Sequence, residues 1–403
     1  MCLGNGTSQT FSIGYDSFLS FLGNGMNKIY ADHAATTPLD EDAYQAMEPY
    51  LRYEYGNPSS AHSLGRLPQK AITESREMIA ACIGAEADEI VFTSGGTESD
   101  NWAIKGVALK YQNRGRHLIT SAIEHHAVLH SCDFLGNLGF ETTILPVDTE
   151  GVVHQSVLEN SLRRDTILVS VMLANNEIGT VQDVAGLSQV ARASRCLFHT
   201  DAVQVVGHLP VDVKTLGCDL LSASAHKFNG PKGVGFLYIR RGVELWNWLS
   251  GGGQEGRRRA GTENVAGIVG MAVALRKNIA MMNETLIHLN RLSALLLERL
   301  TNSGVDYRMN GAKERVPGNV SLSIRGMDGE QILHRLDLRG IAISTGSACN
   351  SRHTELSHVV RAIGVPAEYA HGTIRISLGR SNTEEEVIRI ADEIRKIVRP
   401  IRD

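Results

Sequence analysis

From about Glu89 onward, short apolar runs alternate with stretches of helical periodicity. The runs "EIVFTSGG" (89–96), "HLITSAI" (117–123) and "TILVSVML" (166–173) are rich in β-branched residues and predict strands, and "TESDNWAIKGVALKY" predicts a helix after the first of them. Further strands are expected at "TTILPV", "CLFHTD", "LLSASAH" and "GVGFLYI". Strands that alternate with helices are typical of a mainly parallel sheet with helices on both faces. The first two-thirds of the chain is therefore predicted to be an α/β domain.

The last third has a different pattern. Between Val265 and Leu300, apolar residues recur at helical spacing, and a break is expected near Asn283. Two expected strands, "GNVSLSI" and "TIRISL", then enclose the helical segment "DGEQILHRLDLRG". A last helix follows "SNTEEE", where Thr383 and Glu386 are expected to form a capping box. This pattern predicts a smaller α+β C-terminal domain.

Composition narrows the class of protein. Of the 403 residues, 42% are hydrophobic and 21% are charged, as in ordinary soluble globular proteins. A net charge of −4 gives no electrostatic reason to expect nucleic acid or a membrane surface as a partner, and no apolar run has the length of a membrane helix. The six cysteines are scattered without C-x-x-C pairs, which favours a reducing, cytoplasmic compartment and gives no metal site. Residues 1–25 lack the features of a signal or transit peptide and are expected to form a flexible extension.

Two polar residues follow expected strands at positions where open α/β sheets bind ligands. Lys227 in "SAHKFNGPKG" is either a solvated loop lysine or an amine held for covalent chemistry. Asp201 in "HTDAVQ" either caps the next helix or contacts a ligand. A lysine and a carboxylate together match the needs of pyridoxal phosphate, which takes a Schiff-base lysine and an acid at its ring nitrogen. The turn "TSGGTESDN" either is only a tight turn or holds a phosphate on the backbone at a helix start, where Thr97 adds a hydroxyl.

Taken in order, eight motifs carry a family resemblance: "DHAATTP", "TSGGTESDN", "EHHAV", "NNEIGT", "DAVQ", "SAHKFNGPKG", "RRAGTEN" and "GSACNS". The chain from about Lys28 to its end resembles the cysteine desulfurases of the NifS/IscS-like group, members of the class V aminotransferase family with the fold-type I architecture of pyridoxal-phosphate enzymes. The resemblance implies a homodimer that takes sulfur from L-cysteine and leaves L-alanine and an enzyme persulfide. It also implies a large cofactor domain over 37–285 and a small domain over 26–36 and 286–403.

The same resemblance implies a role for each motif residue. Lys227 would be the Schiff-base residue and, once released, the general base that removes the substrate Cα proton. His125 would stack on the pyridine ring, and Asp201 would keep the ring nitrogen protonated. The phosphate would be held by Gly96, Thr97, Ser224 and His226, together with Thr262 of the other subunit. Asn176 and Gln204 would contact the ring oxygen and the substrate, although motif spacing leaves Asn175 open as an alternative to Asn176.

Two further residues are expected to act on the substrate. Cys349 lies in the polar stretch "STGSACNSRHTE", whereas Cys82 and Cys218 have apolar neighbours and are expected to be packing residues. We expect the Cys349 thiolate to attack the substrate sulfur, with Arg352 and His353 nearby in sequence. Arg375 alternates with Ile374 and Ile376, so it either lies on a solvated strand face or, as the family implies, binds the substrate carboxylate.

Rival functions remain at this point. A selenocysteine lyase or another class V aminotransferase would use the same fold, although an aminotransferase has no use for a loop thiol. A non-enzymatic scaffold is disfavoured by Lys227, Asp201, His125 and Cys349. The expected sulfur acceptor is a protein such as an iron–sulfur scaffold, and the sequence does not identify it.

Overall fold

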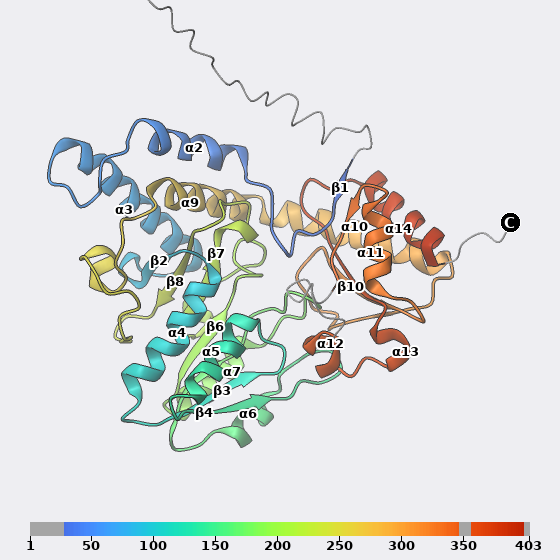
Figure 1. Cartoon of the computed structure of the whole chain (residues 1–403), viewed down its shortest axis with the longest axis horizontal. Coiled ribbons are helices and arrows are strands. Elements are labelled where there is room, and N and C mark those ends of the chain that lie inside the picture. Colours follow the sequence, from blue (N-terminus) through green and yellow to red (C-terminus); the bar gives the residue numbers. More distant parts are fainter. Residues whose placement is uncertain (1–27, 346–355, 399–403) are drawn as a thin grey trace, which may run out of the picture.

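The computed structural model describes residues 28–345 and 356–398. Its largest element is a seven-stranded sheet (Figure 1). The strand order across this sheet is β2 (Ile90–Thr93), β8 (Gly235–Ile239), β7 (Leu220–Ser224), β6 (Leu197–Asp201), β5 (Thr166–Ser170), β3 (His117–Ser121) and β4 (Glu141–Leu145). Only β8 runs antiparallel to its neighbours β2 and β7. The predicted strands and the mainly parallel sheet are thus confirmed.

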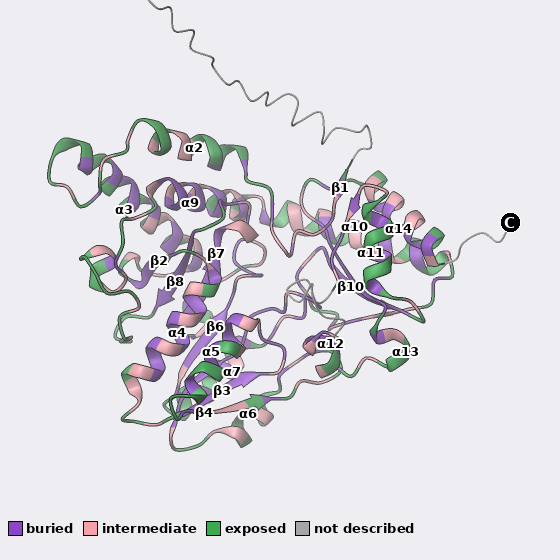
Figure 2. Ribbon diagram, in the orientation of Figure 1, coloured by how far each residue is buried: buried purple, intermediate pink, exposed green. Residues whose placement is uncertain are grey.

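Helices cover both faces of this sheet because successive strand residues point to opposite sides. Leu118 and Leu220 pack with α4 (Gly96–Tyr111) and α5 (His126–Gly136). Their neighbours Ile119 and Leu221 belong to a second apolar core with the helices α3 (Ser63–Ile83), α6 (Gln155–Ser161), α7 (Val184–Ala193) and α9 (Val265–Ala280). The inner strands are buried, whereas β4 at the edge is partly exposed (Figure 2).

The chain between these elements forms further helices and helical turns. α2 (Glu41–Arg52) precedes α3 and lies against α9. The remaining helical elements of this part are η1 (Ala87–Glu89), α8 (Val213–Leu216), η2 (Ala225–Lys227) and η3 (Gln254–Arg257).

A separate apolar core lies in the C-terminal part of the chain. It is built on an antiparallel sheet in the order β12 (Thr373–Ser377), β10 (Asn319–Ile324) and β9 (Tyr307–Met309). The helices α10 (Met282–Asn302), α11 (Gly329–Asp337) and α14 (Glu384–Val398) contribute to this core, and α13 (Ala367–Ala370) lies against β10. α12 (His358–Ala362) instead packs through Val359 in a small cluster with Ile123, Met172 and Ile178. The strand β1 (Ile29–Tyr30) pairs in parallel with β11 (Ile341–Ala342), so the first described residues pack with this C-terminal core.

Two local predictions for this region are confirmed. The helical stretch breaks at Met281, where α9 and α10 meet at 69°. The Thr383 amide donates to Glu386 Oε2 and the Glu386 amide donates to Thr383 Oγ1, which is the expected capping box. Within the described residues, no single helix has the length and apolar character to cross a bilayer; α9 and α10 meet that test only as a bent pair.

Candidate active site

A cavity of about 320 Å³ opens beside the carboxyl ends of the parallel strands. β2, β3, β5, β6 and β7 all end at this edge, because β8 reverses direction between β2 and β7. Segments that are distant in sequence therefore meet there. The cavity is lined by the following residues expected from the sequence: Gly96, Thr97, His125, Asn176, Asp201, Gln204, Ser224, His226, Lys227 and Arg375.

Lys227 lies just beyond β7, in the short helical turn η2. Its Nζ donates to the carbonyl oxygens of Ala34 at 2.6 Å and Ala35 at 2.8 Å, and the side chain is half-buried. These carbonyls satisfy an ammonium group that burial would otherwise destabilise. Lys227 is therefore not a solvated loop residue, and its amine lies at the wall of the cavity.

Asp201 ends β6 and is 5% exposed. Its Oδ1 accepts a hydrogen bond from the Val203 amide at 2.9 Å, and no helix begins there, so the helix-capping alternative is wrong. Burial raises the pKa of Asp201 to about 6, although the positive charge of Lys227 opposes that shift. A cation bound in the cavity would stabilise the ionised form of such a buried carboxyl group.

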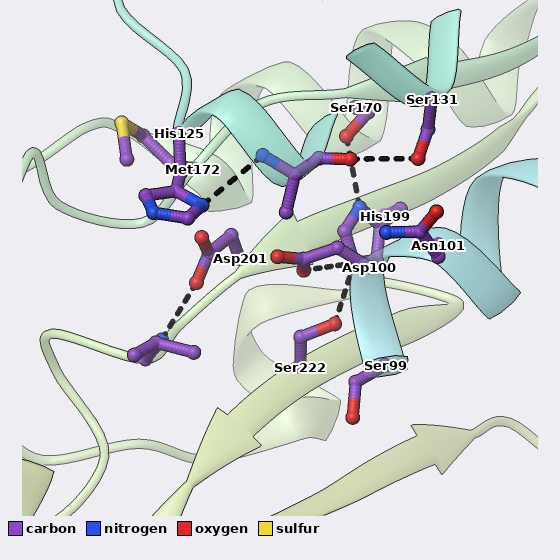
Figure 3. A network of polar contacts seen from close by, with 12 residues as sticks. Ser99, Asp100, Asn101, His125, Ser131, Ser170, Met172, His199, Asp201 and Ser222 are labelled. Atoms are coloured by element: carbon purple, nitrogen blue, oxygen red, sulfur yellow. Dashed lines mark hydrogen bonds and ion pairs between the residues drawn. The ribbon is translucent and has the colours of Figure 1, made fainter. Parts of the chain in front are cut away.

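His125 caps α5 with its side chain, as Nδ1 accepts from the Ala127 amide at 3.2 Å. Its proton is therefore on Nε2 in the neutral ring. Burial, and then the charge of Lys227, lower the pKa of His125 to about 4. The cavity thus presents an uncharged imidazole opposite Asp201 (Figure 3).

The turn between β2 and α4 has the shape expected of an anion cradle. Gly95 has φ of 147°, a conformation that favours glycine, and a Cβ on Gly96 would lie only 2.7 Å from Val203 Cγ2. Thr97 is exposed at the first turn of α4, a helix of 16 residues that begins at the cavity, since Gly96 and Thr97 both line it. His226 Nδ1 lies 3.1 Å from Thr36 Oγ1.

The neighbouring asparagines have separate tasks. Asn175 is buried, its Nδ2 donates to the Ile123 carbonyl at 2.7 Å, and its Oδ1 accepts the amides of Glu177 and Ile178. These hydrogen bonds of the Asn175 side chain stabilise the loop. Asn176 instead lines the cavity, so its position favours Asn176 over Asn175 for contact with a ligand.

Arg375 is 2% exposed, so the solvated-face alternative is wrong. Ile374 and Ile376 point into the C-terminal core, and Arg375 points from the other face of β12 to the cavity. Its Nη1 donates to the Asn176 carbonyl at 2.9 Å and its Nη2 to Asp32 Oδ1 at 2.8 Å. Nε has no partner among the described residues, so the guanidinium retains a buried donor.

Comparison with known proteins shows the family of the chain. The family model of the aminotransferases of class V matches residues 29–390. A cysteine desulfurase IscS from Dictyoglomus turgidum is 51% identical over 376 residues, which cover 93% of this chain and 95% of that protein. The chain belongs to the cysteine desulfurases of the class V aminotransferase family.

Solved structures agree with this family assignment. A NifS-like protein has a TM-score of 0.87 and 39% identity, over 92% of this chain and 99% of that one. A structure described as SspA in complex with cysteine has a TM-score of 0.79 and 36% identity, over 88% of this chain and 100% of the other. The fold-type I architecture expected of this desulfurase is confirmed.

Two expected site residues are not seen at this cavity. Thr262 lines a separate hollow with Ser94, Gly233 and Arg259. Cys349, with the other residues of 346–355, lies outside the described residues.

The four described cysteines of this desulfurase are unsuited to nucleophilic attack. Burial raises the pKa of Cys82 and Cys196 to about 11, and that of Cys132 and Cys218 to about 12. All four are therefore protonated thiols at neutral pH, and only a thiolate is a competent nucleophile. The expected packing roles of Cys82 and Cys218 are confirmed.

Sequence reasoning missed three acidic residues that line the same cavity, namely Asp100, Glu124 and Glu177. Each occurs inside a quoted motif: Glu124 and Glu177 are next to His125 and Asn176, and Asp100 is three residues after Thr97. Their place inside these motifs was the available signal. Burial raises the pKa of Glu177 to about 7, and its Oε2 accepts from Ser357 Oγ at 2.6 Å.

Proposed function

We propose that this protein is a pyridoxal-phosphate-dependent cysteine desulfurase that converts L-cysteine to L-alanine and transfers the sulfur to Cys349 as a persulfide. The observation that carries the proposal is the meeting of the Lys227 amine, the Asp201 carboxyl group and the His125 ring in one cavity. The family assignment and the cysteine complex of the SspA structure support the same substrate.

The cavity fits pyridoxal phosphate. The backbone at Gly96 and Thr97, where α4 begins, and the side chains of Ser224 and His226 would supply donors for a phosphate. Asp201 supplies the negative charge that a protonated ring nitrogen needs, and His125 supplies a neutral aromatic face. When bound, the cofactor serves as the sink for the electron pair left at Cα as the proton departs.

The other catalytic roles belong to residues of the chain. Lys227 Nζ lies at the wall of the cavity, where it can receive the Cα proton as general base. The Cys349 thiolate attacks the substrate sulfur, so that an S–S bond forms and the C–S bond breaks. The electron pair of the broken bond stays with the substrate carbon, which takes up a proton and leaves as L-alanine. Gln204, held by its bond to the Ala34 carbonyl at 3.0 Å, and Asn176 would orient the reactants.

The proposed active form is a homodimer, in which Thr262 of one subunit completes the phosphate site of the other. Its place in a separate hollow, and not in the lining of its own cavity, supports this arrangement. The proposed sulfur acceptor is a further protein such as an iron–sulfur scaffold.

A direct assay tests the proposal. Purified protein loaded with pyridoxal phosphate is expected to release L-alanine from L-cysteine in amounts equal to the sulfide recovered with a reducing thiol. An aminotransferase would instead need a keto-acid acceptor and would convert cysteine to a keto acid. Alanine formation that depends on an added keto acid, or no yellow cofactor complex at all, would contradict the proposal.

Arg375 is expected to bind the substrate carboxylate through its unpartnered donor. Arg375→Ala should raise the KM for cysteine by about 10²-fold, since a buried charge-assisted contact is worth about 2–5 kcal/mol, while cofactor content stays normal. Asp32→Asn is the matched control because it alters the partner of Arg375 but keeps the guanidinium. Steady-state kinetics that show an unchanged KM in Arg375→Ala would rule out this role.

A further inference from the structure

Three of the carboxyl groups that line the cavity are close enough for the charges of two of them to act on the third, Asp100. Besides Asp201, these are Asp100 on α4 and Glu124 directly before His125, which are 1% and 0% exposed. Among the described residues, neither Asp100 nor Glu124 forms an ion pair with a lysine or an arginine, and Asp100 Oδ1 and Glu124 Oε2 have no hydrogen-bond partner. Three buried carboxylates cannot all be ionised so close together, because burial and mutual repulsion both disfavour the charged forms.

Asp201 is the carboxyl group best suited to remain an anion. It accepts the Val203 amide at 2.9 Å and is stabilised by the charge of Lys227. Glu124 Oε1 accepts from Ser121 Oγ at 2.6 Å and from the Met172 amide at 2.9 Å, yet burial still raises the pKa of Glu124 to about 8.

Asp100 has weaker support than either. It has a hydrogen bond with Ser222, and burial and then the charge of Asp201 raise its pKa well above the ordinary value. The nearest basic group is His199, whose Nε2 lies 3.6 Å from Asp100 Oδ1, too far for a hydrogen bond.

The groups behind Asp100 offer no positive charge. His199 is fully buried, with Nδ1 2.8 Å from Ser170 Oγ and Nε2 3.0 Å from Ser222 Oγ (Figure 3). Burial lowers the pKa of His199 to about 3, so the imidazole is neutral. The series Ser170, His199, Ser222 and Asp100 is therefore a chain of neutral polar groups if Asp100 holds a proton, and it contains an uncompensated anion if Asp100 does not.

We propose that Asp100 is a proton-carrying positioning residue, a neutral carboxylic acid behind Asp201 that leaves Asp201 as the anion for the ring nitrogen of the cofactor. The role at the cofactor rests on the proposed function, whereas the bound proton is a property of the protein alone. A second anion at Asp100 would raise the proton affinity of Asp201 and thereby weaken its ionised form.

Infrared spectroscopy tests the proton directly. Full-length protein labelled with ¹³C at aspartate carboxyl groups, without cofactor and at a pH well above the value of about 6 for Asp201, should show a label-sensitive C=O band of a protonated acid. The band should be lost in Asp100→Asn and kept in Asp212→Asn, a matched control at the exposed cap of α8. Glu124 does not interfere because it carries no label.

If Asp100→Asn does not fold, the same infrared spectrum of ¹³C-labelled Asp219→Asn serves to assign the band to one aspartate. Asp219 is the remaining described aspartate whose pKa burial raises, so a band that survives its replacement belongs to Asp100. A folded wild-type protein with no such band would overturn the inference.

The cofactor complex supplies the second measurement. Asn has the charge of a protonated Asp, so the pH midpoint of the cofactor absorbance in Asp100→Asn should stay within about 0.3 units of the wild-type value. An ionised Asp100 would instead make that midpoint fall by about one unit or more on replacement, as expected for loss of a nearby buried charge. If the protein takes up no cofactor, the proposed function fails, and the infrared result still decides whether Asp100 holds a proton.

Discussion

Lys227→Ala is expected to lower the rate of alanine formation by at least about 10³-fold, since a positioned general base alone contributes about 10²–10⁴-fold to a rate. The substitution removes the amine that lies between the carbonyls of Ala34 and Ala35 at the cavity wall. The variant therefore lacks both the group that attaches the cofactor and the group that accepts the Cα proton. The cofactor should then be lost on gel filtration, which absorbance of the protein fraction measures, and single-turnover assays should show the rate loss.

Lys232→Ala is the matched control for this experiment. Lys232 lies in the same glycine- and proline-containing segment, but it is exposed and does not line the cavity. It should retain cofactor and near wild-type activity. Retention of the cofactor through gel filtration by Lys227→Ala, with normal alanine formation, would contradict the assignment.

Cys349→Ser is expected to abolish persulfide formation and to lower alanine formation by at least about 10³-fold, while the cofactor absorbance stays normal. A serine hydroxyl is not ionised at neutral pH and does not attack a thiol sulfur. None of the described cysteines can replace Cys349, since burial keeps each of them protonated. Mass spectrometry of the protein after reaction with cysteine should detect one added sulfur in the wild type and none in the variant.

Two other cysteine variants complete the test. Cys82→Ser and Cys2→Ser should both still gain the sulfur, because Cys82 is a partly buried packing residue and Cys2 lies in the expected N-terminal extension. A persulfide found on Cys349→Ser, or its loss in Cys2→Ser, would place the nucleophile elsewhere.

Local patterns were sufficient for much of the architecture. The strands that end at Thr93, Asp201 and Ser224 follow from short apolar runs, and the cap of α14 follows from Thr383 and Glu386. These features depend on contacts between neighbouring residues or on burial of a whole segment, both of which leave a signature in the linear order.

Side-chain environment depended on the fold instead. Alternation placed Arg375 on the opposite face of the strand from Ile374. It did not show whether that face is exposed to solvent or buried, because the face is buried by packing of the segment of Asn176, which is distant in sequence. The same holds for Asn175, which motif spacing could not separate from Asn176.

The amino-acid sequence by itself determined the order of strands and helices, the family, and the lysine, aspartate and histidine that meet at one edge of the sheet. Only the tertiary structure decided that Asp100 and Glu124 join Asp201 there without a lysine or arginine partner among the described residues. The physical reason is that protonation depends on burial and on the distance between charges from separate segments, and neither quantity is written in the local sequence.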